Sequence, residues 1–206
     1  MTVSNCIISS YGDYAIRVGV GLAPIKNCIF SNIRIFNSQC GIGMTACFSL
    51  YGTSTGTQIE NISFNNFSIS ALRPIDLRLI SQDGITLTPP CSINNISLSD
   101  ITAEGIRDNH LYGYENGEFS DVSLVNCRFI CGGKGKISEH WDSRGMWDND
   151  TSDSAFIIRK VNGVKMSNVS VKWTDDSSDW DYDVTVTDSE NVVFDRCDFS
   201  KGINEK

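Results

Sequence analysis

Two arginines and two aspartates have side chains that could bind or act on an acidic ligand. Arg17 lies in Tyr14–Gly19, where every second residue is apolar, and Asp76 and Arg78 lie in a similar alternating segment. Guanidinium N–H donors hold a carboxylate in a fixed geometry, and a carboxyl group can act as a general acid or base. Asp13 and Asp76 are therefore the catalytic candidates. Arg17 and Arg78 are candidates for binding a substrate.

Three aromatic residues are candidates for contacting a sugar ring: Tyr14, Tyr112 and Trp141. Trp141 stands in the long insertion Gly132–Ser154, and its flat face could stack on a pyranose. The plainer interpretation is that this tryptophan packs against the body of the protein. Likewise, the charged residues named above could be exposed charges on a sheet face, where an ion pair contributes well under ~1 kcal/mol.

Metal ligands are weakly indicated. The acidic segment Trp173–Asp183 could hold calcium through carboxylates, but it lacks the spaced ligands and glycine of a calcium loop, which favours a solvated turn. The eight cysteines show no CxxC or paired Cys/His spacing. We therefore predict buried free thiols and neither a metal nor another cofactor.

The elements that must position these residues are copies of one repeat. Its clearest copy is Ile59–Leu72, I-E-N-I-S-F-N-N-F-S-I-S-A-L, in which apolar and polar residues alternate on both sides of a polar bend residue. The bend positions recur along the chain every 26 to 42 residues, at Asn5, Asn32, Asn66, Asp100, Asn126, Asn168 and Arg196. A period in this range is typical of a solenoid.

Alternation with period two predicts strands, and short strands must stack on neighbouring copies to bury their apolar face. A third strand is expected in each copy, at Tyr14–Gly19, Gly41–Ala46, Pro74–Ile80, His110–Tyr114, Ala155–Arg159 and Asp183–Asp188. Asparagine at the bends should adopt left-handed backbone angles and bond to the copies above and below. We predict an all-β, single-stranded, right-handed parallel β-helix of about six to seven coils, forming one domain over residues 1–206. The outward face of the third strands should carry Arg17, Asp76, Arg78 and Tyr112.

Composition excludes several classes of partner. The formal net charge of −8 and the lack of a Lys/Arg cluster argue against nucleic acid. No apolar run approaches the ~18 residues of a membrane span, and no signal peptide precedes the repeat. Because a solenoid needs a cap on its open end, we expect upstream coils or another subunit, as in a homo-oligomer, to cover the first coil.

The run from Ile59 to Ile75 resembles the V-E-N-V-T-F-S-N-I-T-M-x-N-V-x-x-P-I pattern of the polygalacturonase-type glycoside hydrolases of family 28, within the pectate-lyase-like β-helix group. The resemblance covers nearly the whole chain, mostly in repeat residues. It implies a carbohydrate-active protein with a pectic or other acidic polysaccharide or oligosaccharide as partner. It also implies an extracellular or periplasmic location.

In that family, catalysis uses aspartates in N-T-D and D-D motifs, a G-H-G and a substrate-binding R-I-K, and two alignments are open. In the first, Gly12–Ile16 matches G-D-D-x-I with one aspartate kept, and Cys40 takes the histidine position. In the second, which we prefer, Tyr14–Gly19 matches H-G-I-S-I-G and Gly43–Thr45 matches R-I-K, so the catalytic aspartates fall before Met1. Either way the motifs of this inverting glycosidase are incomplete. We expect an incomplete or inactive catalytic domain, or alternatively a non-catalytic, glycan-binding or tailspike-like module; an active glycosidase that receives its missing coils from upstream sequence or a separate chain stays open.

Overall fold

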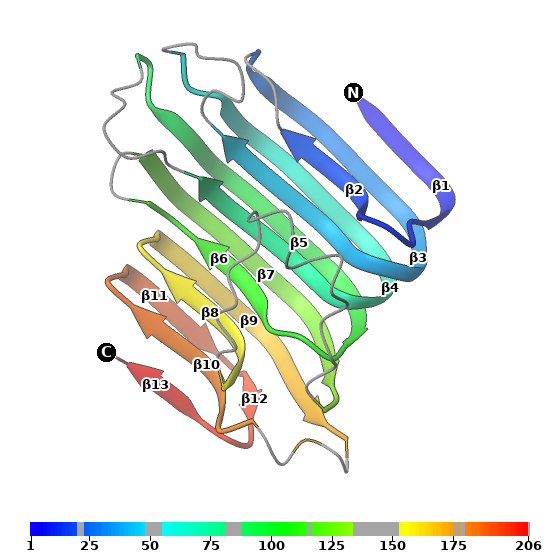
Figure 1. Ribbon diagram of the computed structural model, residues 1–206. Helices are drawn as coiled ribbons and strands as arrows, with labels where there is room; N and C mark the ends of the chain where they lie inside the picture. The colour runs from blue at the N-terminus through cyan, green and yellow to red at the C-terminus, as the bar shows by residue number, and fades with distance from the viewer. Residues whose placement is uncertain are drawn as a thin grey trace.

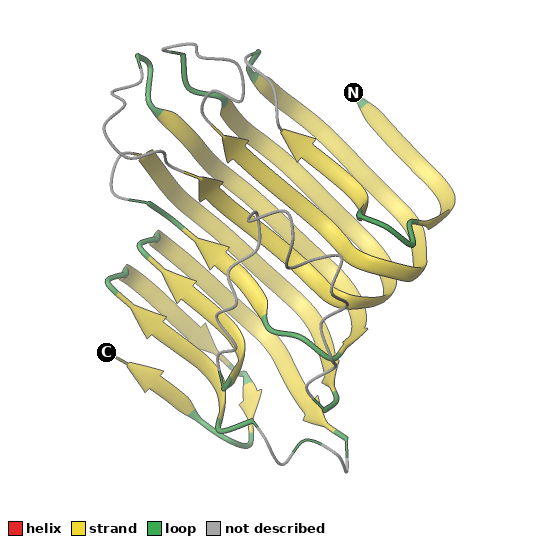
Figure 2. Cartoon of the chain, in the orientation of Figure 1, coloured by secondary structure: helices red, strands yellow, loops and turns green. Residues whose placement is uncertain are grey.

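The computed structural model describes residues 1–19, 23–47, 55–80, 88–114, 117–133, 153–174, 177 and 180–205, and this part of the chain contains strands and no helix (Figures 1 and 2). All its strand pairs are parallel, and the strands curl into a half-barrel. The prediction of an all-β chain is confirmed, and the arrangement is consistent with a β-helix solenoid. Accordingly, none of the described residues forms a helix that could cross a membrane.

The thirteen strands follow one another as β1 (Thr2–Ser9), β2 (Tyr14–Gly19), β3 (Ile25–Cys47), β4 (Gln58–Ile80), β5 (Cys91–Gly105), β6 (Asn109–Tyr112), β7 (Gly117–Cys131), β8 (Ser154–Arg159), β9 (Asn162–Trp173), β10 (Tyr182–Thr187), β11 (Glu190–Asp195), β12 (Asp198–Phe199) and β13 (Ile203–Glu205). Strands far apart in the sequence lie side by side in Figure 1 because each pairs with its equivalent one coil away. The longest strands, β3 and β4, each run around bends and form successive faces of a coil.

Left-handed residues make these bends. All seven predicted bend residues have positive φ, between 53° and 57°, including Asp100 and Arg196. Asparagine and aspartate tolerate this region better than other residues with a β-carbon. A second row of left-handed bends was not predicted, at Asn27, Asn61, Asn95, Asp121, Gly163 and Asn191. The prediction of left-handed bends is confirmed, and the sequence contains more of them than we expected.

Amide ladders connect the bends of neighbouring coils. Asn32 Nδ2 donates to Asn5 Oδ1 at 3.2 Å, and Asn66 Nδ2 donates to Asn32 Oδ1 at 2.8 Å. The second row continues in the same way, with Asn61 donating to Asn27 at 3.0 Å. In each pair the later coil donates to the earlier one. The predicted bonds between copies are therefore present.

The predicted third strands also stack. We call the resulting surface the third sheet; it contains β2, the ends of β3 and β4, and then β6, β8, β10 and β13. Its register places Arg17 opposite Gly43, and Gly43 opposite Asp76. Asp76 in turn lies opposite His110. Side chains that alternate along these strands therefore form straight rows across the coils.

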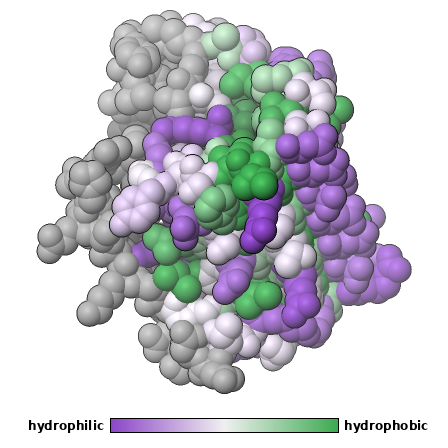
Figure 3. All heavy atoms as spheres, turned by 90° about the vertical axis from the view of Figure 1, so that its right-hand side faces the viewer, coloured by the Kyte–Doolittle hydropathy of each residue, from purple (hydrophilic) through white to green (hydrophobic). Residues whose placement is uncertain are grey.

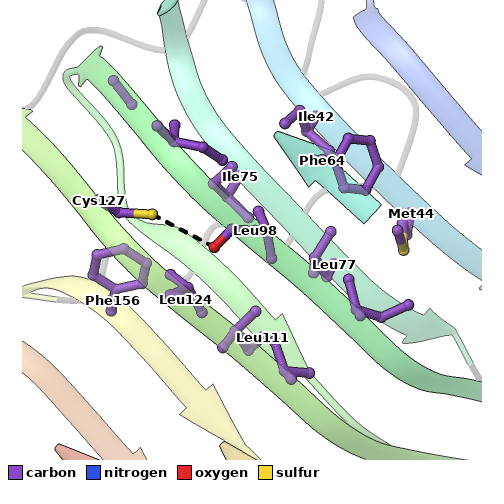
Figure 4. Close-up of a cluster of buried hydrophobic side chains, with 14 of the residues drawn as sticks. Ile42, Met44, Phe64, Ile75, Leu77, Leu98, Leu111, Leu124, Cys127 and Phe156 are labelled. Carbon is purple, nitrogen blue, oxygen red and sulfur yellow. Dashed lines mark hydrogen bonds between the residues drawn. The ribbon is translucent and has the colours of Figure 1, made fainter. Parts of the chain in front are cut away.

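The core is one cluster of apolar side chains that runs through the coils (Figure 4). Equivalent residues stack on one another, as Phe30 and Phe64 do with ring centroids 5.0 Å apart. Cysteines take part as small apolar residues: the seven whose side chains the structure describes are free thiols, and five of them are buried. Cys127 Sγ lies 3.7 Å from the carbonyl oxygen of Leu98. The prediction of buried free thiols is confirmed for these five, whereas Cys6 and Cys197 are only partly buried.

The first coil is less well covered than the coils behind it. Val3, Cys6 and Ile8 pack against the core but stay partly exposed, and Ile7 is largely exposed. Figure 3 views the molecule from the side on which β1 lies and shows apolar surface near its centre, bordered by hydrophilic residues. In the middle coils, by contrast, the core side chains are fully buried.

Replacing Asn66 should separate the two roles of a bend residue. Asn66→Ala should lose the side-chain hydrogen bond to Asn32, which lowers the free energy of unfolding by about 1 kcal/mol. An alanine in the left-handed conformation should cost about another 1–2 kcal/mol. Asn66→Gly keeps the angle free and should lose less. Urea unfolding of both variants measures the difference, with the exposed strand residue Ser68→Ala as the control. Equal losses in the two variants would show that the backbone angle contributes nothing.

Candidate functional site

A buried polar cluster lies on the third sheet and beside the starts of its strands. It consists of Tyr14, Cys40, Arg73, Asp76, Arg78, Asp108, His110 and Tyr112, all of which are buried. Asp76 and Arg78 alternate with core residues of β4 such as Leu77, so their side chains lie on the outer face of the sheet. The same alternation puts His110 and Tyr112 of β6 on that face. The repeat therefore brings residues from distant parts of the sequence into one cluster.

The interpretation of Asp76 and Arg78 as exposed charges on a sheet face is wrong. Asp76 is 0% exposed, Arg78 5% and Tyr112 6%, whereas only Arg17 is exposed. Alternation predicts which face a side chain takes, but it does not predict whether other parts of the protein cover that face. The cluster is therefore a buried network and not a row of solvated charges.

Asp76 is the centre of the network. Its Oδ1 accepts hydrogen bonds from Arg78 Nε at 2.8 Å and Arg78 Nη2 at 2.5 Å, and it lies 3.1 Å from His110 Nδ1. Its Oδ2 accepts a hydrogen bond from the Tyr14 hydroxyl at 2.9 Å. Groups from three strands thus surround one carboxylate.

His110 connects Asp76 to a second ion pair. Its Nε2 lies 3.2 Å from Asp108 Oδ2, although this contact is not a well-aligned hydrogen bond. Arg73 donates to Asp108 through Nη2 at 2.7 Å and through Nε to the Asp108 carbonyl oxygen at 2.8 Å. The His110 ring also stacks on Tyr112, with centroids 4.6 Å apart. His110 therefore lies between two arginine–aspartate ion pairs.

Tyr14 reaches Asp76 because Gly43 has no side chain. A β-carbon at Gly43 would overlap the Tyr14 ring, so the ring lies across the backbone at that position. Arg17 also lies over the ring, with its guanidinium carbon 5.0 Å from the centroid, and pairs with Asp13 at 3.4 Å. The chain thus holds Tyr14 in place through two contacts that do not involve Asp76.

Electrostatics keeps both buried carboxylates ionised. Burial alone would raise the pKa of Asp76, but the charge of Arg78 and the hydrogen bond with His110 outweigh it and hold this pKa well below its usual range. The pKa of Asp108 is lowered in the same way, against burial, by His110 and Arg73. A general acid needs a raised pKa, so neither carboxyl group is suited to protonate a leaving group.

Cys40 and Tyr14, which the two alignments place at the histidine position of the polygalacturonase pattern, both lie in this cluster. Cys40 lies opposite Tyr14 in the register of the third sheet. Burial, and then the charge of Asp76, raise the pKa of both side chains far above their usual values. Neither group can therefore act as a base near neutral pH, which a histidine could do.

The sequence analysis did not select His110, Arg73 or Asp108 as site residues. A signal was present, because His110 stands 34 residues after Asp76, which is the local period of the repeat. The same shift relates Arg78 to Tyr112. Applying the period to the outward residues would have predicted the contact between Asp76 and His110.

Lys201 contacts the described part of the acidic segment, whereas Asp175, Asp176 and Asp179 lie outside the described residues. Lys201 Nζ donates to the carbonyl oxygens of Ser177 at 2.9 Å and Trp180 at 2.6 Å, and it lies 4.5 Å from the centroid of the Trp173 ring. The Asp183 carboxylate is buried and accepts a hydrogen bond from Trp173 Nε1 at 2.9 Å. The ammonium group takes up carbonyl oxygens that would otherwise be available to a cation.

Trp141 and a metal site are the remaining candidates from the sequence. Trp141 and most of the insertion around it lie outside the described residues. Within the described ranges, no three His, Cys, Asp or Glu side chains are grouped closely enough to hold a metal ion.

Comparison with known proteins gives no relative, since no family model and no curated protein matches the chain.

Removing the cation beside Asp76 should be severely destabilising. Arg78→Ala leaves a buried carboxylate unpaired, which costs about 3–5 kcal/mol, whereas Arg34→Ala on an exposed strand position should change stability by less than about 0.5 kcal/mol. The double variant Asp76→Asn/Arg78→Met removes both charges and should lose less than Arg78→Ala alone. Denaturant unfolding tests this order, and a loss near zero for Arg78→Ala would contradict it.

The cluster should also make the protein sensitive to acid. Asp76 and Asp108 have lower pKa values in the folded state than the ~3.9 of an unfolded aspartate, so the unfolded state binds protons more readily. Their stabilisation is complete above that value and decreases as the pH falls through it. We expect the urea midpoint to drop below about pH 4, with a shallower drop in Asp76→Asn. An equally steep drop of the urea midpoint with pH in the natural protein and in Asp76→Asn would contradict the role of Asp76 in this acid sensitivity.

Proposed function

We propose that this protein is a carbohydrate-binding parallel β-helix related to the polygalacturonase-type glycoside hydrolases, and that it holds an acidic polysaccharide without cleaving it. The observation that carries the proposal is the state of the two buried carboxylates in the cluster. Asp76 and Asp108 are paired with arginines and have lowered pKa values. A β-helix with neutralised acids on its third sheet fits a binding module better than a hydrolase.

An inverting glycosidase needs a protonated acid and a base, with about 6.5–9.5 Å between the carboxyl groups to admit a water molecule. Asp76 has both oxygens engaged by donors and no exposed surface. The other candidate, Asp13, is partly exposed and pairs with Arg17. Neither residue offers the acid that the reaction requires.

The relation to family 28 is supported by the repeat around Ile59–Ile75 together with the parallel fold. A right-handed coil, with six to seven turns, is part of this proposal, because crossovers between parallel strands of one sheet are right-handed in almost all proteins. A polysaccharide ligand would also place the protein outside the cytoplasm, in the extracellular space or the periplasm. The fold alone does not determine the ligand.

Arg17 is the residue best placed to contact an acidic glycan. It is exposed beside the cluster, its guanidinium carbon lies 5.0 Å from the centroid of the Tyr14 ring, and only its Nη1 pairs with Asp13, at 3.4 Å. Arg159, at the end of β8, is a second exposed arginine on the same sheet. Tyr14 and Tyr112 are buried and are not suited to stack on a sugar ring, so charge would dominate the interaction.

Incubation with polygalacturonate and rhamnogalacturonan tests the proposal. Affinity electrophoresis should show retardation that weakens by roughly tenfold in Arg17→Gln, the value of one lost charge-assisted contact, and that is unchanged in the matched control Arg34→Gln. A reducing-end assay on the same mixtures should show no product. Release of reducing ends that disappears in Asp76→Asn would identify a hydrolase instead. If the protein binds neither polygalacturonate nor rhamnogalacturonan, the glycan proposal is refuted.

A further inference from the structure

We infer that Tyr14, Arg78 and His110 form a binding site for a carboxylate group, and that the chain fills this site with its own Asp76. The inference concerns the buried cluster alone and stands whether or not the protein binds glycans. It assigns the ligand class from the chemistry of the groups that converge on one point.

The number and direction of the donors match a carboxylate. Arg78 presents Nε and Nη2 to one oxygen, and the Tyr14 hydroxyl donates to the other oxygen from a different strand. His110 Nδ1, from β6, lies 3.1 Å from both the first oxygen and Arg78 Nη2, and it donates to the oxygen in the tautomer that carries the proton on Nδ1. Charge-assisted hydrogen bonds of this kind are stronger than neutral ones and favour an anionic acceptor. A neutral group of the same size would leave buried donors poorly paired.

Most of the site is held in place without Asp76. The Tyr14 ring lies against the backbone at Gly43, and the guanidinium carbon of Arg17 is 5.0 Å from its centroid. His110 is held by stacking on Tyr112 and by the contact of Nε2 with Asp108. Removing the Asp76 side chain should therefore leave Tyr14 and His110 close to their present positions.

Asp108 is fixed in turn, because Arg73 binds it through two nitrogens. The site is thus supported on the side away from Asp76 by a separate ion pair. Its own filling residue comes from β4, the strand that also supplies Arg78. A group tethered in this way acts at a very high effective concentration, so a free carboxylate cannot compete with it in the natural chain.

Chemical rescue tests the inference. In Asp76→Ala the site is vacant, and formate or acetate should restore stability because each binds the folded state only. We expect the thermal midpoint of the variant to rise with carboxylate concentration, by on the order of 5 °C at a hundredfold excess over Kd. The natural protein should show no such rise. Sodium chloride at equal ionic strength and neutral acetamide should not substitute for the carboxylates.

Two further variants make the result decisive. Asp76→Ala/Arg78→Ala lacks the main donor and should lose the rescue, while Asp76→Asn fills the site with a neutral side chain and should not respond to acetate. If Asp76→Ala does not fold alone, its refolding yield with and without acetate becomes the readout, and dependence on acetate supports the inference. An equal response to chloride overturns it, as does a complete lack of response to both carboxylates.

Discussion

In-register parallel pairing is the constraint on which the rest of the structure depends. It places each residue directly against its equivalent one coil away, so every row across the sheet must be compatible with itself. Apolar rows satisfy this requirement by stacking, as Phe30 and Phe64 do. Amide rows satisfy it because asparagine can both donate and accept. Charged residues cannot repeat in this way, and Lys26 accordingly lies opposite Glu60.

The buried polar cluster follows the same constraint. Along one row, Gly43, Asp76 and His110 differ from coil to coil, so that an acid is followed by a group that can donate to it. Arg73 and Arg78 then neutralise the two acids from neighbouring positions. Such a network costs desolvation energy, which apolar rows of equal volume would avoid. We interpret the network as a set of contacts that fixes the register between neighbouring coils.

The sequence allowed the bends and third strands to be predicted because both depend on local chemistry. Asn66 favours a left-handed bend wherever it stands, and alternation in Tyr14–Gly19 specifies a strand without reference to distant residues. The burial of Asp76 could not be predicted, because it depends on what covers the outer face. The role of His110 was missed for a different reason: its partner is 34 residues away, and contact follows only once the register is known.

The direction of the amide ladder gives the two ends of the solenoid different chemistry. Asn32, Asn66 and Asn168 each donate toward the coil that precedes them, so a bend residue can receive a hydrogen bond from the following coil only where its side chain carries an acceptor. Arg196, the seventh residue of this row, carries donors alone. The ladder therefore has a polarity, and an arginine at a bend offers no acceptor to a side chain on its C-terminal side.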